Sequence, residues 1–272
     1  MIPLEDNAID IVQKAQRGLG LSDAALAESA GISRELIGKL RQGDLDEQVL
    51  LRIAPALGLD GRALCEIASG RWRPGKIECD GLGQFNTRYH DMAVNAYLVW
   101  DPAERAAATF DTGADCAQML RFANRRGLTV KLILLTHAHA DHVADLARLR
   151  EETGASVYAP AREPVSGAEP IEEGRKFRLA NLEITARLTW GHSPGGITYV
   201  VSGLARPIAI VGDSLFAGSM GGGNVSYHEA VRNNLEKILT LPNETIICPG
   251  HGPMTTVGEE KQHNPFFAGK VP

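Results

Sequence analysis

The stretch that decides the fold is VKLILLTHAHADH, residues 130–142. Five of its first six residues are apolar, which is typical of a short strand that is buried on both faces. The strand candidate is followed at once by His137, His139, Asp141 and His142. On extended chain His137 and His139 point the same way, while Asp141 opens the next helix. Because three imidazoles and a carboxylate within six residues are costly to bury without a partner, the pattern predicts a metal site.

Three further candidate ligands each follow an apolar strand candidate and a glycine. They are His192 after LEITARLTWG, Asp213 after PIAIVG and His251 after TIICPG. The end of a rigid strand can hold a side chain in place while leaving it open to a substrate. Nitrogen and oxygen donors without thiolate suit Zn²⁺, and they also suit Fe or Mn.

The region from residue 79 onward alternates short apolar strand candidates with helical segments. Strands are expected at residues 94–100, 106–110, 130–136, 155–160, 182–190, 197–202, 207–212 and 245–250. Helices are expected at residues 116–127, 142–154 and 228–240. This order suits an α/β fold in which two sheets pack face to face with helices outside.

The N-terminal region follows a different pattern, that of short helices separated by glycines. Apolar residues recur three and four apart within residues 8–20, 22–31, 33–43, 47–58 and 61–69. Ser22 and Ser33 lie where helix N-caps are expected, and Gly31 lies where a helix should end. We therefore predict an all-α domain at residues 1–70, a linker containing Gly, Pro and Arg at 71–78, and a second domain at 79–272.

The composition is that of an ordinary soluble protein. The 272 residues carry 28 basic and 33 acidic side chains and a formal net charge of −5, a balance that by itself points to no particular partner. No membrane partner is expected. Four widely spaced cysteines without a CxxC pair argue against a disulfide framework. The acidic start lacks a signal sequence, and no apolar run approaches the roughly 20 residues of a membrane span. We expect a cytoplasmic protein.

Four segments resemble the metallo-β-lactamase superfamily, and the glyoxalase II branch is the most similar. They are THAHADH at 136–142, GHSPGG at 191–196, GDSLFAGS at 212–219 and PGHGP at 249–253, and the resemblance covers residues 80–268. It implies a four-layer αββα sandwich, here preceded by the small all-α domain. It also implies one metal on His137, His139 and His192, another on Asp141, His142 and His251, and Asp213 as the bridge between them.

The resemblance further implies two divalent ions, with zinc first and iron or manganese as alternatives. Such a pair supplies a bridging hydroxide that attacks a small thioester, with Asp141 as the catalytic residue that orients it and passes a proton. The longer glyoxalase II enzymes carry a C-terminal extension that grips glutathione, whereas about twenty residues follow His251 here. Tyr227 and His228, after the glycine-rich residues 218–224, are candidate contacts to a small-molecule substrate.

Two other functions remain alternatives. An iron-dependent dioxygenase that acts on glutathione persulfide has a similar ligand set in this superfamily but fills one metal position. A regulator would use the same fold to sense metal and its N-terminal domain to bind DNA.

The N-terminal segment ALAESAGISRELIGKLRQGDL, residues 25–45, resembles the phage-repressor type of helix-turn-helix. In such a motif Arg34, Lys39 and Arg41 would reach bases or phosphates from the recognition helix. Residues 1–70 nevertheless carry eleven acidic against seven basic side chains, a net of −4 that disfavours binding to nucleic acid. Three interpretations stay open: a docking or homodimerisation module, a DNA-binding module, and a lid or support for the metal site.

Overall fold

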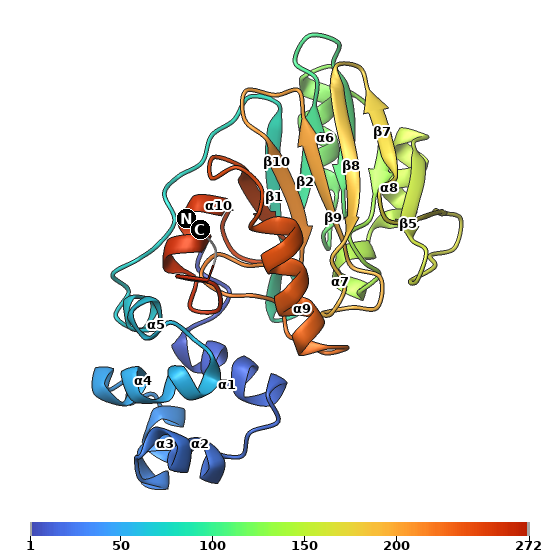
Figure 1. Ribbon diagram of the computed structural model, residues 1–272. Helices are drawn as coiled ribbons and strands as arrows, with labels where there is room; N and C mark the ends of the chain where they lie inside the picture. Colours follow the sequence, from blue (N-terminus) through green and yellow to red (C-terminus); the bar gives the residue numbers. More distant parts are fainter. Residues whose placement is uncertain (1, 271–272) are drawn as a thin grey trace.

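The apolar runs beyond residue 79 form two six-stranded sheets that pack against each other (Figure 1). The structure is a computed structural model that describes residues 2–270, so residues 1 and 271–272 of the predicted domains lie outside it. The first sheet has the order β1-β2-β3-β4-β5-β6 and the second has the order β12-β11-β10-β9-β8-β7. The strands are β1 (Leu82–Tyr89), β2 (Met92–Trp100), β3 (Ala106–Phe110), β4 (Thr129–Leu134), β5 (Ser156–Pro160), β6 (Glu169–Ile171), β7 (Lys176–Leu179), β8 (Leu182–Leu188), β9 (Ile197–Ser202), β10 (Ile208–Gly212), β11 (Ile246–Pro249) and β12 (Thr255–Thr256).

The inner faces of the two sheets bury one apolar cluster that includes Tyr97, Phe110, Ile184 and Tyr199. Within the first sheet β4 pairs in parallel with β3 and with β5. Within the second sheet β10 pairs in parallel with β11. Because parallel strands end at the same edge of a sheet, the loops that follow them gather there.

Helices cover both outer faces of the sandwich (Figure 1). Met119 and Leu149 pack helices α6 and α8 onto the first sheet, and Ile238 and Val257 belong to the cluster outside the second. The helices are α6 (Ala117–Arg125), α7 (Ala140–Val143), α8 (Leu146–Thr153), α9 (Tyr227–Asn233), the π-helical turn η2 (Asn234–Ile238) and α10 (Val257–His263). The predicted α/β fold with a four-layer αββα sandwich is therefore confirmed.

The structure adds strands β1, β6, β7 and β12 and helix α10, which the sequence did not predict. β1 reads LGQFNTRY, a largely polar edge strand, while β6 and β12 have only three and two residues. The helix predicted at 142–154 is divided into α7 and α8. The helix predicted at 228–240 changes to π-helical geometry at Asn234, whose side chain donates hydrogen bonds to the backbone oxygens of Ser214 and Ala230. Such side-chain bonds to backbone compete with regular helix geometry.

The N-terminal region contains the predicted short helices. They are α1 (Ala8–Gly18), α2 (Asp23–Ala30), α3 (Arg34–Arg41), α4 (Glu47–Ile53), the 3-10 turn η1 (Pro55–Leu57) and α5 (Gly61–Ala68). Ser22 and Ser33 accept hydrogen bonds from backbone nitrogens of the first turns of α2 and α3, and Gly31 ends α2 with a φ of 61°. These three predicted boundaries are confirmed. None of the helices within residues 2–270 has both the length and the hydropathy of a membrane-spanning segment.

The N-terminal helices and the outer layer of the second sheet share one hydrophobic core. Ile11 and Leu64 belong to the same buried cluster as Phe266 and Phe267 near the C-terminus. Trp72 of the predicted linker joins this cluster with 7% of its surface exposed. Its indole nitrogen donates to the Glu259 carboxylate at 2.8 Å, and its ring stacks on His263 with 5.2 Å between ring centroids. The division into two domains stays a prediction, but the two parts are packed together.

We expect Trp72→Ala to lower the free energy of unfolding by about 3–5 kcal/mol, because it leaves a cavity in the shared core. Urea unfolding followed by circular dichroism measures this. Leu51→Ala, at a side chain that is 40% exposed, is the control. A loss no larger than that of the control would contradict a shared core.

Candidate metal centre

The seven candidate ligands converge in one cluster. Two of them, Asp141 and His142, belong to α7, which lies at one end of the sandwich (Figure 1). They come from the loops that follow four strands: His137, His139, Asp141 and His142 follow β4, His192 follows β8, Asp213 follows β10 and His251 follows β11. Their ligand atoms form groups whose members lie within 4.8 Å of one another, so the cluster is able to bind metal ions.

The first group consists of His137, His139, His192 and Asp213. His139 directs Nδ1 into the group, at 3.0 Å from His137 Nε2 and 3.1 Å from His192 Nε2. Asp213 Oδ2 lies 3.4 Å from His192 Nε2 and 4.0 Å from His137 Nε2. Three ring nitrogens and a carboxylate oxygen thus surround one point.

The second group consists of Asp141, His142 and His251, and Asp213 also contacts it. Asp141 Oδ2 lies 3.4 Å from His142 Nε2 and 3.3 Å from His251 Nε2. Asp213 places Oδ1 at 3.3 Å from His142 Nε2 and Oδ2 at 3.4 Å from His251 Nε2. Asp213 is therefore the one carboxylate of the seven side chains that contacts both groups.

Two buried polar atoms of the centre, His142 Nε2 and Asp213 Oδ1, have no hydrogen-bond partner among the described residues. An unsatisfied buried polar atom is costly. A cation beside both atoms would remove that cost. The donor set of imidazole nitrogens and carboxylate oxygens also fits divalent transition metals. The residues present therefore fit the two ions expected from the sequence.

The ring nitrogen that faces away from the centre is held by another group in four of the five histidines. The pairs are His137 Nδ1 with Thr136 Oγ1 at 3.0 Å, His142 Nδ1 with Asp111 Oδ2 at 2.8 Å, His192 Nδ1 with the Gly222 oxygen at 3.0 Å and His251 Nδ1 with the Ala93 oxygen at 2.6 Å. Such outer contacts fix the orientation of a ligating imidazole and decide which nitrogen faces the metal.

Asp111 is a functional residue that the sequence did not single out. It follows β3, is 2% exposed and adopts a left-handed backbone with a φ of 55°. Its carboxylate accepts hydrogen bonds from the Thr136 backbone nitrogen and hydroxyl at 2.8 Å and contacts His142. The signal that could have revealed it is the one that marked the ligands, a polar residue directly after an apolar strand.

Gly250 leaves room for the shared carboxylate. A Cβ at this position would lie 2.1 Å from Asp213 Oδ1 and 2.7 Å from a carbon of the His142 ring. Such distances are far below ordinary van der Waals contact. A glycine directly before His251 is therefore required by packing around Asp213.

The carboxylates change the pKa of two histidines. Burial lowers the pKa of His142, but the charges of Asp213 and Asp111 outweigh burial and raise this pKa to about 10. Burial also lowers the pKa of His251, whereas Asp213 and Asp141 raise it to about 11. Without metal both imidazoles are protonated at neutral pH. A cation that binds them must displace these protons.

The candidate substrate residues lie at the start of α9. The Tyr227 ring packs on Gly18 of α1, where a Cβ would lie 2.2 Å from the ring. Burial raises the Tyr227 pKa to about 12. His228 is exposed, with its ring 6.0 Å from that of Tyr227. A contact of either residue with a substrate stays a prediction.

Two of the three candidate DNA-contacting side chains on α3 already bind other side chains of this protein. Arg41 donates to Asp23 at 2.6 Å and to Gln16 at 2.8 Å, and Lys39 pairs with Glu35 at 3.0 Å. Arg34 is exposed. Two of the three cations are thus already paired with acceptors from their own domain.

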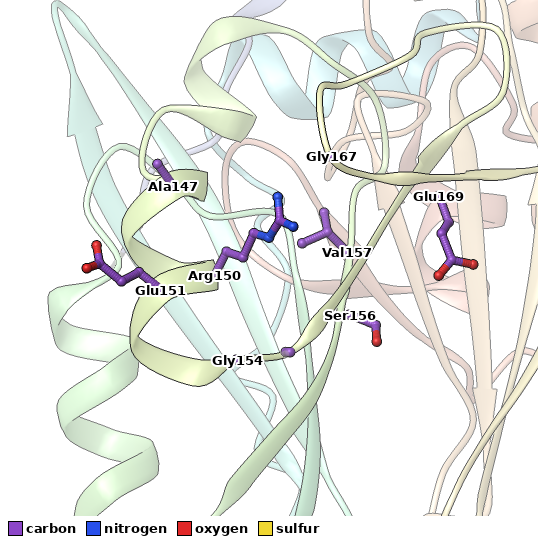
Figure 2. A pocket seen from close by; sticks show the side chains of 9 residues that line it. Ala147, Arg150, Glu151, Gly154, Ser156, Val157, Gly167 and Glu169 are labelled. Carbon is purple, nitrogen blue, oxygen red and sulfur yellow. The ribbon is translucent and has the colours of Figure 1, made fainter.

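Figure 2 shows a surface pocket of about 530 Å³ beside α8. It is formed by α8, by β5 and by the loop that leads to β6, and Figure 2 shows the Arg150 side chain between α8 and the loop at Gly167. None of the seven candidate ligands lines it. Its size alone therefore does not indicate where chemistry occurs.

We expect Asp213→Ala to lower metal occupancy at both positions, because each group loses a carboxylate oxygen. Elemental analysis of metal-replete protein measures this, with His251→Ala as a comparison that removes a ligand from one group only. Loss of a single ion in Asp213→Ala would contradict a shared ligand.

We also expect metal affinity to rise with pH through neutrality, because His142 and His251, with pKa values of about 10 and 11, carry protons that compete with the metal. Calorimetric titration at pH 7 in buffers of different ionisation enthalpy should report proton release. The absence of any proton release would overturn the proposed protonation of the metal-free centre.

Similarity to known proteins agrees with this geometry. Residues 91–251, more than half of the chain, match the protein family described as Metallo-beta-lactamase superfamily. The chain is 34% identical over 206 residues to the "Probable metallo-hydrolase YqgX" of Bacillus subtilis, covering 65% of this chain and 94% of the relative. It is 28% identical over 201 residues to the "Hydroxyacylglutathione hydrolase GloC" of Haemophilus influenzae, covering 65% and 93%.

A solved structure described as "TTHA1623 in a di-iron-bound form" superposes with a TM-score of 0.54 at 31% sequence identity, covering 67% of this chain and all of that one. The family match begins at residue 91, so the helix-turn-helix assignment stays a prediction. The match, the relatives and the fold together confirm the superfamily that the four sequence motifs indicated: the chain belongs to the metallo-beta-lactamase superfamily.

Proposed function

We propose that the protein is a dinuclear-metal hydrolase of a small thioester. The observation that carries this proposal is the presence of two complete ligand groups that share Asp213. Similarity to a hydroxyacylglutathione hydrolase supports the substrate class. Zinc is the first choice of metal, and the di-iron form of a similar structure keeps iron as an alternative.

His137, His139 and His192 would hold one ion, and Asp141, His142 and His251 the other, with Asp213 between them. The outer contacts of these imidazoles keep the inward nitrogens aimed without rearrangement. Two divalent ions held there would lower the pKa of a shared water, polarise the thioester carbonyl and receive the leaving thiolate.

Asp141 is the residue that would handle the proton. Burial raises the pKa of its carboxyl, but the hydrogen bond to His251 and the charge of His142 outweigh burial and lower it. The group is therefore ionised in the metal-free centre, and as a carboxylate it would orient an attacking water and pass its proton on. Its side chain keeps 12% exposure, which lets the proton pass to solvent.

The serines beside the centre are bound to other groups, which supports direct attack by water. The Ser193 hydroxyl donates to Glu163 at 2.7 Å, and the Ser214 hydroxyl lies 2.9 Å from that of Thr189. Neither hydroxyl is paired with a histidine base in these bonds. Burial also raises the pKa of Cys116 to about 12, which keeps this thiol protonated and unreactive.

Phe266 and Phe267, which follow α10, are buried in the core that the N-terminal helices share. These two side chains therefore serve packing and are not free to contact a leaving thiol. Tyr227 and His228, at the start of α9, are the candidates for recognising the leaving group.

One alternative is an iron-dependent persulfide dioxygenase. The group of His137, His139, His192 and Asp213 could hold a single ion by itself. Oxygen consumption with a persulfide, by protein that contains one iron per chain, would favour this function. A metal-sensing regulator would instead show DNA affinity that falls steeply with salt.

We expect metal-replete protein to hydrolyse small thioesters, and His139→Ala or His192→Ala to reduce kcat by about a hundredfold or more, because either loss displaces the ion and the attacking water. Thiol release with a chromogenic reagent measures turnover. Lys176→Met, which removes an exposed ion pair with Glu183, is the control expected to stay active. A protein with two metals that hydrolyses no thioester or lactone would overturn the proposal.

A further inference from the structure

Residues 213–222 form a loop that contains one candidate ligand, Asp213, and contacts another, His192. The loop begins with Asp213 and ends with Gly222, whose backbone oxygen lies 3.0 Å from His192 Nδ1. It folds back so tightly that a Cβ at Gly221 would lie 1.8 Å from the Asp213 oxygen and 3.1 Å from His192 Nδ1. The path of this loop therefore decides how the His192 ring is oriented.

Two charged residues from the N-terminus hold the same loop from its other side. Asp6, just before α1, accepts a hydrogen bond from the Ser219 hydroxyl at 2.5 Å. Lys14 of α1 donates to the Met220 backbone oxygen at 2.9 Å and forms an ion pair with Asp6. The Asp6 and Lys14 side chains are 8% and 14% exposed, and Ser219 is fully enclosed. These contacts form a buried polar network between segments about 200 residues apart.

Helix α1 contacts this part of the chain at two further points. Lys14 Nζ lies over the Phe216 ring at 4.9 Å, and that ring meets the His251 ring edge-on at 5.7 Å. One turn after Lys14, Gly18 lies against Tyr227 at the start of α9. Lys14 and Gly18 are four residues apart and so share one face of α1. This face of α1 therefore contacts the chain at Phe216, Met220 and Tyr227.

The N-terminal segment also meets the loop of the second ligand group. A Cβ at Gly252, the residue after His251, would lie 3.2 Å from the Glu5 backbone nitrogen. The start of the chain therefore borders the loops that carry His251 and Asp213. Without residues 5–18, both loops would lose packing contacts.

We propose that Asp6 and Lys14 are positioning residues of the metal centre, and that the N-terminal helices brace the loop at 213–222 and through it His192. This proposal rests on the metal centre of the proposed function. Of the three interpretations of the N-terminal domain, this proposal favours the one in which the domain supports the metal site. A buried polar network whose groups are satisfied rigidifies its surroundings, and the directional bonds of Lys14 therefore hold the loop more closely than apolar packing would.

The test measures metal binding without a substrate. Metal-free protein is titrated with Zn²⁺ against a chromophoric chelator, and His192→Ala identifies the step that belongs to the first ligand group. Wild-type protein that binds no zinc would overturn the proposed function itself. If wild-type protein binds two ions, the proposed function stands, and the variants then test only the role of the N-terminal contacts to residues 213–222.

Lys14→Met retains an unbranched chain over Phe216 but removes the charge. The single variant leaves the Asp6 carboxylate buried without its partner, which could unfold the protein. The double variant Asp6→Asn with Lys14→Met removes both charges and so controls for this effect. Lys176→Met, at an exposed lysine 3.0 Å from Glu183, is the matched control. The melting temperature of each metal-free variant is recorded alongside.

We expect both variants to weaken zinc at the His192 position by about 10- to 100-fold, as loss of an outer contact does, with a smaller effect at the other position. The control should match the wild type. Unchanged affinity at the His192 position would overturn the proposal. Equal weakening at both positions that follows the fall in melting temperature would also overturn it, since this is the result of a merely structural role.

Discussion

The centre depends on one buried carboxylate, that of Asp213, because it is the point at which both ligand groups meet. Its oxygens lie 3.3–3.4 Å from nitrogens of His142, His192 and His251. Burial acts to raise the Asp213 pKa, but the charges of His142 and His251 outweigh burial and hold the pKa well below its usual range. The group therefore stays ionised inside the protein. A buried anion among imidazoles is costly unless a cation or protons neutralise it.

Much of the surrounding structure keeps this carboxylate and its partners in place. The parallel pairing of β10 with β11 brings Asp213 next to the His251 loop, and Gly250 makes the space that Asp213 fills. Asp111 holds His142 from behind. The loop that continues from Asp213 is contacted by Lys14 of α1, through the Met220 backbone oxygen and the Phe216 ring. We infer that the N-terminal helices are part of the construction of the metal centre.

The sequence predicted those features whose residues are close together or repeat a pattern. THAHADH and the glycine-preceded His192, Asp213 and His251 were recognisable because each follows an apolar strand, and the amphipathic helices had clear caps. Asp111 was missed because a single aspartate after a strand also suits a turn. Edge strand β1 was missed because it is polar. The contacts of Lys14 could not be predicted, since a lysine on an amphipathic helix is ordinarily solvated and its partner Met220 lies 206 residues away.

The most direct test of a dinuclear centre is a crystal structure with diffraction recorded on both sides of the absorption edge of the bound metal. We expect two anomalous peaks about 3.5–4 Å apart, with the Asp213 carboxylate touching both. The His192 ring should be held by the loop that Lys14 contacts. A single peak among His137, His139, His192 and Asp213 in metal-replete crystals would contradict the dinuclear centre and favour the single-metal alternative.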